Sequence, residues 1–129
     1  MCDALKEQLK ELNSRSRWYS SQLWYIPFAY FSLVAVTLAN VINKQPSQIG
    51  IALIACGVLG IFVIWHMCLI MNGEKRAIKH LKDVEEKLSL DSTVEEKPYS
   101  YPFLAGVVVV TINSLVFGIL LSCRCGLIQ

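Results

Sequence analysis

The chain has 129 residues, of which 54% are hydrophobic and 17% are charged, and its formal net charge is +2. A soluble domain of this size shows apolar residues alternating with polar ones at helical or strand spacing, because half of each element faces water. Here the charges are instead gathered into blocks, and three long segments contain no Asp, Glu, Lys or Arg. The composition therefore excludes an ordinary soluble globular domain.

The uncharged segments cover residues 18–43, 45–73 and 98–123. Each is longer than the roughly 20 residues that a helix needs to cross about 30 Å of hydrocarbon. They are too long for barrel strands of about ten residues, and a backbone in lipid must satisfy its own hydrogen bonds. We therefore expect an all-α integral membrane protein, a single membrane domain with three transmembrane helices at residues 22–43, 48–72 and 102–123.

The first uncharged segment differs from a cleavable signal peptide, because it starts later and runs longer than the short apolar core of such a peptide. We expect it to be a permanent span. Residues 1–17, which precede it, carry an apolar stripe at helical spacing and predict an amphipathic helix, with Cys2, Leu5, Leu9 and Leu12 as the stripe. This helix either lies at the inner membrane surface, packs on the cytoplasmic loop, or contributes to an oligomerisation seam.

A second amphipathic helix is predicted at residues 73–90, where Ala77, Leu81, Val84 and Leu88 form the apolar stripe. We expect it to continue the second span, with Asn72 and Gly73 as a flexible joint. Residues 91–101 lose this pattern and are interpreted as a linker, in which either of two pairs can form a capping box, Ser92 with Glu95 or Thr93 with Glu96.

The distribution of basic residues predicts the orientation. Of the 12 Lys and Arg residues, 10 lie before the first span or between the second and third, and 2 lie at Lys44 and Arg124. An excess of Lys and Arg marks the cytoplasmic side of a membrane. We therefore expect a protein of the cell membrane (inner membrane), with the N-terminus and the loop at residues 74–97 in the cytoplasm and the tail at residues 124–129 outside. The aromatic residues at the inner ends agree with this placement: Trp18, Tyr19, Trp24, Tyr25, Tyr99 and Tyr101.

Polar residues within the spans are candidates for helix packing or for lining a pore, because a hydrogen-bonding group in hydrocarbon needs a partner. They include Asn40 in the first span and Thr111, Asn113 and Ser114 in the third, of which Asn113 is the deepest amide. The spans contain no acidic or basic side chain, which argues against a proton or cation relay.

Small residues fall four apart on one face of the second span, at Ala52, Cys56 and Gly60. Such a face allows two helix backbones to approach closely. Two interpretations are open: packing against the other spans of the same chain, or contact between subunits.

Two cysteines in the outer tail, Cys123 and Cys125, are candidates for an intersubunit disulfide, with two free thiols as the alternative. His66 lies among Trp65, Met67 and Cys68, but adjacent helical residues point about 100° apart and so do not form a ligand set. We expect no metal site and no cofactor. Because the sequence offers no nucleophile with a base and no carboxylate pair, we expect no enzymatic activity.

The layout of residues 1–90 resembles that of the SLATT group. It comprises an amphipathic helix, a basic and aromatic segment at residues 15–19, a tight hairpin, and a charged helix that opens with Glu74 and Lys75. SLATT proteins are small bacterial two-span proteins thought to act as membrane effectors in antiviral and conflict systems. The resemblance implies a membrane effector, and the third span departs from the pattern.

Two functional hypotheses follow. The first is a small homo-oligomeric membrane protein that forms a pore or perturbs the bilayer and is gated by its cytoplasmic helices. The second is an accessory or assembly subunit of a larger membrane complex. The expected partners are the lipid bilayer, further copies of the chain and, for the second hypothesis, another membrane protein, with no role for nucleic acid.

Overall fold

The computed structural model describes residues 2–89 and 100–126, with side chains described for residues 4–89 and 101–123. Within these ranges the chain forms three α-helices, α1 (Cys2–Val41), α2 (Pro46–Lys87) and α3 (Ser100–Gly126). All three are long and apolar enough to cross a membrane. They confirm the expected all-α class and the three candidate spans. Most of the predicted linker and both proposed capping boxes fall at residues 90–99, outside the described residues.

Both long helices are uninterrupted where the segments expected from the sequence meet. α1 has no end between residues 17 and 22, and α2 does not break at Asn72 and Gly73. A helix can leave a membrane without interruption because its backbone hydrogen bonds are internal in either solvent. α1 also continues through Pro27, a fully buried residue that has no N–H to donate to the carbonyl of Leu23. The predicted amphipathic segments are thus the ends of two longer helices.

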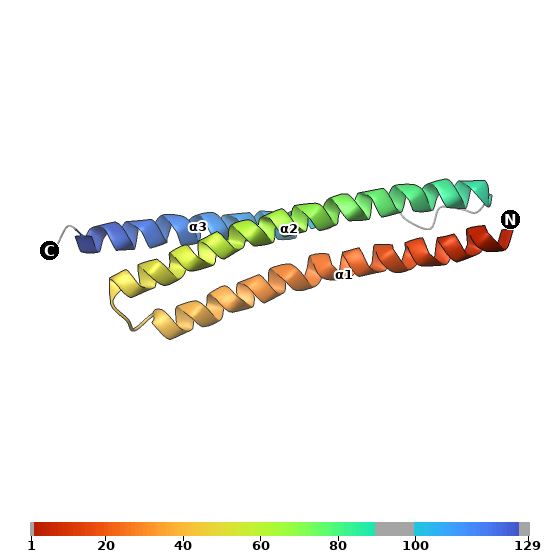
Figure 1. Cartoon of the computed structure of the whole chain (residues 1–129). Helices are drawn as coiled ribbons and strands as arrows, with labels where there is room; N and C mark the ends of the chain where they lie inside the picture. Colours follow the sequence, from red (N-terminus) through yellow and green to blue (C-terminus); the bar gives the residue numbers. More distant parts are fainter. Residues whose placement is uncertain (1, 90–99, 127–129) are drawn as a thin grey trace.

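A short connection folds α1 and α2 into an antiparallel hairpin (Figure 1), as the sequence predicted. The Lys44 N–H donates to the Val41 carbonyl at 2.9 Å, and Gln45 precedes Pro46 at the start of α2. Proline suits this position because the first helical N–H has no partner within the helix. At its other end α2 stops where Ser89 adopts a left-handed conformation, with φ of 54°.

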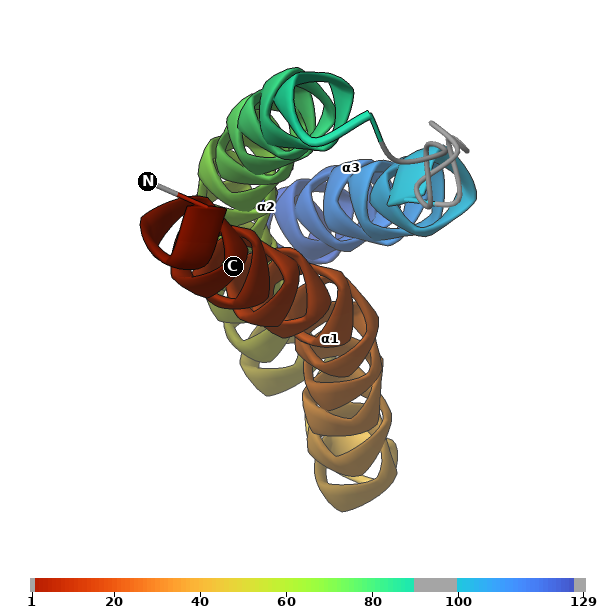
Figure 2. The same cartoon turned by 90° about the vertical axis from the view of Figure 1, so that its right-hand side faces the viewer.

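α3 packs along the part of α2 that follows the connection, and the beginning of α1 and the end of α2 extend beyond it (Figure 1). Seen from the end at which α1 begins, the helices surround a common centre and do not lie in one layer (Figure 2). The core is apolar, and its buried members are Leu23, Tyr30, Val34, Cys56, Met67, Ile70, Met71 and Val107.

Large apolar side chains also cover the outside of the helices. Leu33 on α1, Phe62 on α2 and Phe117 on α3 are 45%, 59% and 55% exposed. An apolar surface on all three helices is unfavourable in water and is what a bilayer requires.

Candidate functional site

A hydrogen-bonded cluster joins the three helices at the centre of the bundle. The Tyr30 hydroxyl of α1 donates to the Cys56 carbonyl oxygen of α2 at 3.2 Å and lies 3.2 Å from Thr111 Oγ1 of α3. Because Tyr30 has one hydroxyl proton, Thr111 donates to the Tyr30 oxygen. Tyr30 is 2% and Thr111 3% exposed, so both hydroxyl groups need these partners. We call Tyr30, Cys56, Gly60 and Thr111 the three-helix node.

Gly60 makes this close approach possible. A Cβ atom at this position would overlap Thr111 Oγ1 and the Tyr30 hydroxyl oxygen. Any larger residue would therefore push α1 or α3 away from α2 and separate the bonded groups. The glycine belongs to the node although it contributes no side-chain atom.

The contact between α2 and α3 continues from the node as a seam of small residues. A Cβ at Gly50 would lie 2.9 Å from the Gly118 carbonyl oxygen, and one at Gly118 would lie 2.9 Å from the Gly50 carbonyl oxygen. One at Gly57 would meet the Leu115 side chain at 2.5 Å. This approach between backbones is typical of helix pairs in membranes, where small residues allow tight van der Waals packing.

The structure brings together several of the residues selected from the sequence. Thr111, Cys56 and Gly60 meet in the node, Ser114 is 5% exposed, and Ala52 is half-buried. Cys56 and Gly60 are buried, and Tyr30 of α1 and Thr111 of α3 lie against Gly60. The glycines of α2 that meet α3 are Gly50, Gly57 and Gly60; of these, Gly60 belongs to the small-residue face predicted from the sequence, and Gly57 is adjacent to that face.

The two candidate amides lie outside the node. Asn40 and Asn113 are exposed, and each donates from Nδ2 to a carbonyl oxygen of its own helix, Asn40 to Val36 at 2.9 Å and Asn113 to Val109 at 2.8 Å. Cys123 is an exposed free cysteine, and the Cys125 side chain lies outside the described part of the chain.

Tyr30 is the residue of the node that the sequence did not single out. The aromatic residues were interpreted as a belt at the inner ends of the spans, and Tyr30 lies deeper than that belt. A tyrosine within an uncharged segment places a hydroxyl group in hydrocarbon, where it needs a partner. The position of Tyr30 deep in the uncharged segment was the signal in the sequence that its hydroxyl group would need a hydrogen-bond partner.

A second cluster lies where α3 begins. The Lys75 ammonium donates to the Tyr101 hydroxyl at 3.2 Å and lies 5.7 Å from the centre of its ring. The Tyr19 ring lies against Gly73, where a Cβ would be 3.0 Å from Tyr19 Cζ. These contacts show that Tyr19 of α1, Gly73 and Lys75 of α2, and Tyr101 of α3 lie at a similar height along the bundle. Nearby, burial raises the pKa of Glu74 above its ordinary value of 4.5.

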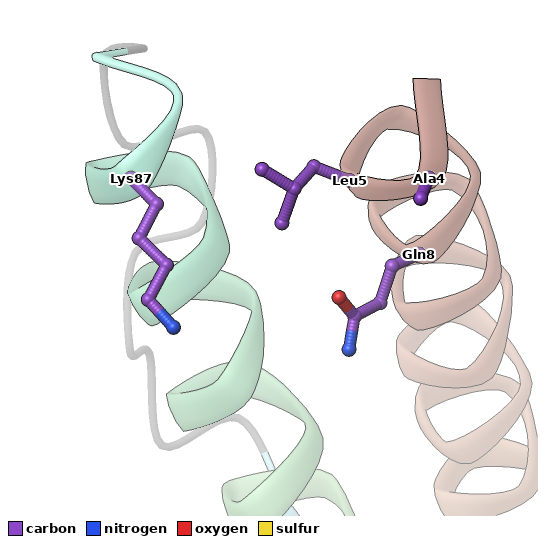
Figure 3. Close-up of a pocket in the computed structure, with 4 residues that line it drawn as sticks. All are labelled: Ala4, Leu5, Gln8 and Lys87. Carbon is purple, nitrogen blue, oxygen red and sulfur yellow. The ribbon is translucent and has the colours of Figure 1, made fainter. Parts of the chain in front are cut away.

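A concave feature lies between the beginning of α1 and the end of α2. It is an open groove lined by Ala4, Leu5, Gln8 and Lys87, in which Leu5 and Gln8 extend from α1 into the space between the helices (Figure 3). Within residues 4–89 and 101–123, no three His, Cys, Asp or Glu side chains lie close enough to hold a metal ion. The node and seam provide hydrogen bonds and close packing that join helices.

Comparisons of the chain with protein-family models, with curated proteins and with solved structures give no significant match. The class that the fold defines is a multi-pass membrane protein with three apolar helices.

Proposed function

We propose that the protein is a small homo-oligomeric membrane protein whose assembled helices form a pore or perturb the bilayer, gated by the cytoplasmic ends of α1 and α2. In this proposal the N-terminus and the 74–97 loop are cytoplasmic and the C-terminus is outside, as the basic residues predict. The resemblance of the layout of residues 1–90 to that of SLATT proteins supports an effector role.

The observation that carries this proposal is the position of Asn113. It lies midway along α3, beside exposed Ile112 and Val116, so in this proposal its amide faces the centre of the hydrocarbon layer. Within the described residues it has one hydrogen bond, to its own helix, so the rest of its polar capacity is unused. An amide in lipid gains by pairing with a polar group on a neighbouring helix. Repeated copies of Asn113 around a symmetry axis would supply such groups to one another.

The packing of a single chain supports an assembly of several. Met67 and Val107 in the interior are 0% exposed, and glycines bring α2 and α3 into backbone contact. An interior packed in this way offers no route for ions or water. A polar path would therefore lie between chains, where Asn113 is exposed.

The extension, defined as residues 4–17 of α1 and 76–87 of α2, supports the gating role. On α2, Ala77, Leu81 and Val84 are buried, whereas Leu5 and Leu9 on α1 are half-buried, and Leu5 borders the open groove at the tip (Figure 3). A helix pair that is packed near the membrane and looser at its tip can change its separation at low cost.

Native mass spectrometry in mild detergent, combined with dye release from vesicles, tests the proposal. The parent should form a discrete oligomer and release dye, and Asn113→Leu should shift the oligomer towards monomer and reduce release. Asn40→Leu is the matched control, because Asn40 makes the same bond to its own helix but lies beside the end of α1 at Val41. A monomeric parent that releases no dye would contradict the proposal.

An accessory subunit of a larger complex is the second candidate, and an aromatic surface supports it. Trp24 and Phe28 on α1 are 48% and 55% exposed, and Trp24 packs on Phe103 of α3 with 4.5 Å between ring centres. Exposed aromatic groups are common at protein interfaces. This candidate predicts that gentle purification recovers a different membrane protein in fixed ratio, and a pure homo-oligomer would exclude it.

A further inference from the structure

Cationic side chains from two helices lie at one level, immediately outside the apolar part of the bundle. The contact of Tyr19 with Gly73 and the bond from Lys75 to Tyr101 fix this level on all three helices. We call the basic residues near it the juxtamembrane collar; they are Arg15, Arg17, Lys75, Arg76 and Lys79, all exposed.

The depth of the collar matches that of a headgroup layer. A helix rises 1.5 Å per residue, so Arg15 lies about 6 Å from Tyr19 along α1, and Lys79 about 9 Å from Gly73 along α2. The polar zone on each side of the hydrocarbon is of similar thickness. Trp18 packs edge-on against Tyr19 at the same level, with 5.2 Å between ring centres, as expected at a membrane interface.

Much of the positive charge in the collar is available to a ligand. Arg15 pairs with Glu11, and Lys75 contacts Tyr101, but Arg17, Arg76 and Lys79 form no ion pair with any described residue. Among the described residues, Glu74 is the acidic residue between Gly73 and Lys79 on α2, and burial raises its pKa, so it holds its proton to higher pH than an ordinary glutamate.

We propose that the juxtamembrane collar is a binding site for the phosphate groups of anionic phospholipids. The ligand is a lipid headgroup because the cations border the apolar surface, so that one molecule can place its phosphate on them and its chains on the helices below. Clusters of basic residues next to a transmembrane helix attract anionic lipids in this way. The proposal requires that the helices cross the bilayer and is independent of the proposed pore.

Quenching of tryptophan fluorescence by brominated lipids tests this site. The purified protein is placed in phosphatidylcholine vesicles that contain increasing amounts of brominated phosphatidylglycerol or brominated phosphatidylcholine. Comparison of the two quenching curves gives the relative affinity for the anionic lipid at the tryptophans, of which Trp18 lies at the collar. Both leaflets carry the lipid, so the direction of insertion does not affect the result.

We expect a preference for the anionic lipid of about fivefold at low salt, the factor that one basic residue contributes at an anionic surface, and a smaller one at high salt. The triple variant Arg17→Gln, Arg76→Gln, Lys79→Gln should lose this preference. The control triple Lys6→Gln, Lys10→Gln, Lys44→Gln removes the same charge outside the collar and should retain it. A charge-preserving variant, Arg17→Lys with Arg76→Lys, should also retain it, which separates loss of charge from loss of fold.

Three results would overturn the proposal: no preference in the parent, equal losses in the two Gln triples, or displacement of the lipid by soluble glycerol phosphate beyond the effect of sodium chloride at equal ionic strength. The last result would assign the collar to free phosphate.

Discussion

Tyr30 links three helices through a single hydroxyl group, and it does so in the part of the molecule where water cannot substitute for a lost partner. Its bonds to Cys56 and Thr111 are the described side-chain hydrogen bonds that connect helices within the apolar region. Hydrogen bonds between membrane helices contribute modestly, on average about 0.6 kcal/mol and at most about 1.7 kcal/mol.

Replacement of Tyr30 by phenylalanine removes both bonds and keeps the ring. We expect Tyr30→Phe to lower the free energy of unfolding by about 1 kcal/mol, measured by denaturant titration in mixed micelles. Tyr25→Phe is the control, because Tyr25 is 68% exposed. Equal stability of the two variants would show that the node does not hold the helices together.

Gly60 is expected to be more sensitive than its size suggests. Gly60→Ala places a methyl group against Thr111 and Tyr30 and should destabilise the fold by about 1–3 kcal/mol. Gly106→Ala is the matched control, since its Cβ would meet only the end of the Phe31 ring at 3.3 Å. We expect the free energy of unfolding of this control to lie within about 1 kcal/mol of the parent's, because alanine exceeds glycine in helix propensity by about that amount. If the two alanine variants have the same free energy of unfolding, the close packing described at Gly60 is contradicted.

At the residue scale, the sequence indicated which side chains need partners but not which partners they find. Thr111 and Asn113 have similar polarity and lie two residues apart, yet one is buried in the node and the other faces outward. Two residues along a helix correspond to a rotation of about 200°, so the orientation of the whole helix decides between them. That orientation follows from the seam with α2, which depends on glycines in two helices at once.

At the scale of elements, the extension shows why the predicted boundaries differ from the observed ones. The sequence predicted an amphipathic helix at residues 1–17 and a separate span at residues 22–43, and the residues around this boundary are rich in serine and arginine. In the structure α1 continues, because a change of solvent alters which residues are favourable and leaves the backbone hydrogen bonds intact. The stripes at residues 5–12 and 77–88 were identified from their spacing alone.

The packing of the extension can be tested through Leu81, which is 1% exposed. Leu81→Ala should leave a cavity and lower the local stability of the helix pair by about 2–5 kcal/mol. We therefore expect faster amide hydrogen exchange both in residues 76–87 of α2 and in residues 4–17 of α1. His80→Ala, at an exposed neighbouring position, should leave exchange unchanged. Unchanged exchange in residues 4–17 after Leu81→Ala would indicate that this part of α1 lies on the membrane surface and does not pack on α2.

At the scale of the whole molecule, the fold class could be predicted because it depends on the length of the uncharged segments and little else. The arrangement of α3 could not, since its 27 residues are apolar on most sides and offer no stripe that selects a neighbour. The structure places it along α2, from Gly50 beside Gly118 to Lys75 beside Tyr101.

An odd number of crossings has one direct consequence, that the two ends of the chain lie in different compartments. Reporters fused before Met1 and after Gln129, each active on one side of the membrane only, test this in intact cells. We expect the N-terminal reporter to be active in the cytoplasm and the C-terminal reporter outside it, with a reporter at Lys44 agreeing with the C-terminal one. If both terminal reporters are active in the same compartment, the chain does not cross the bilayer three times, and the account of its function fails with it.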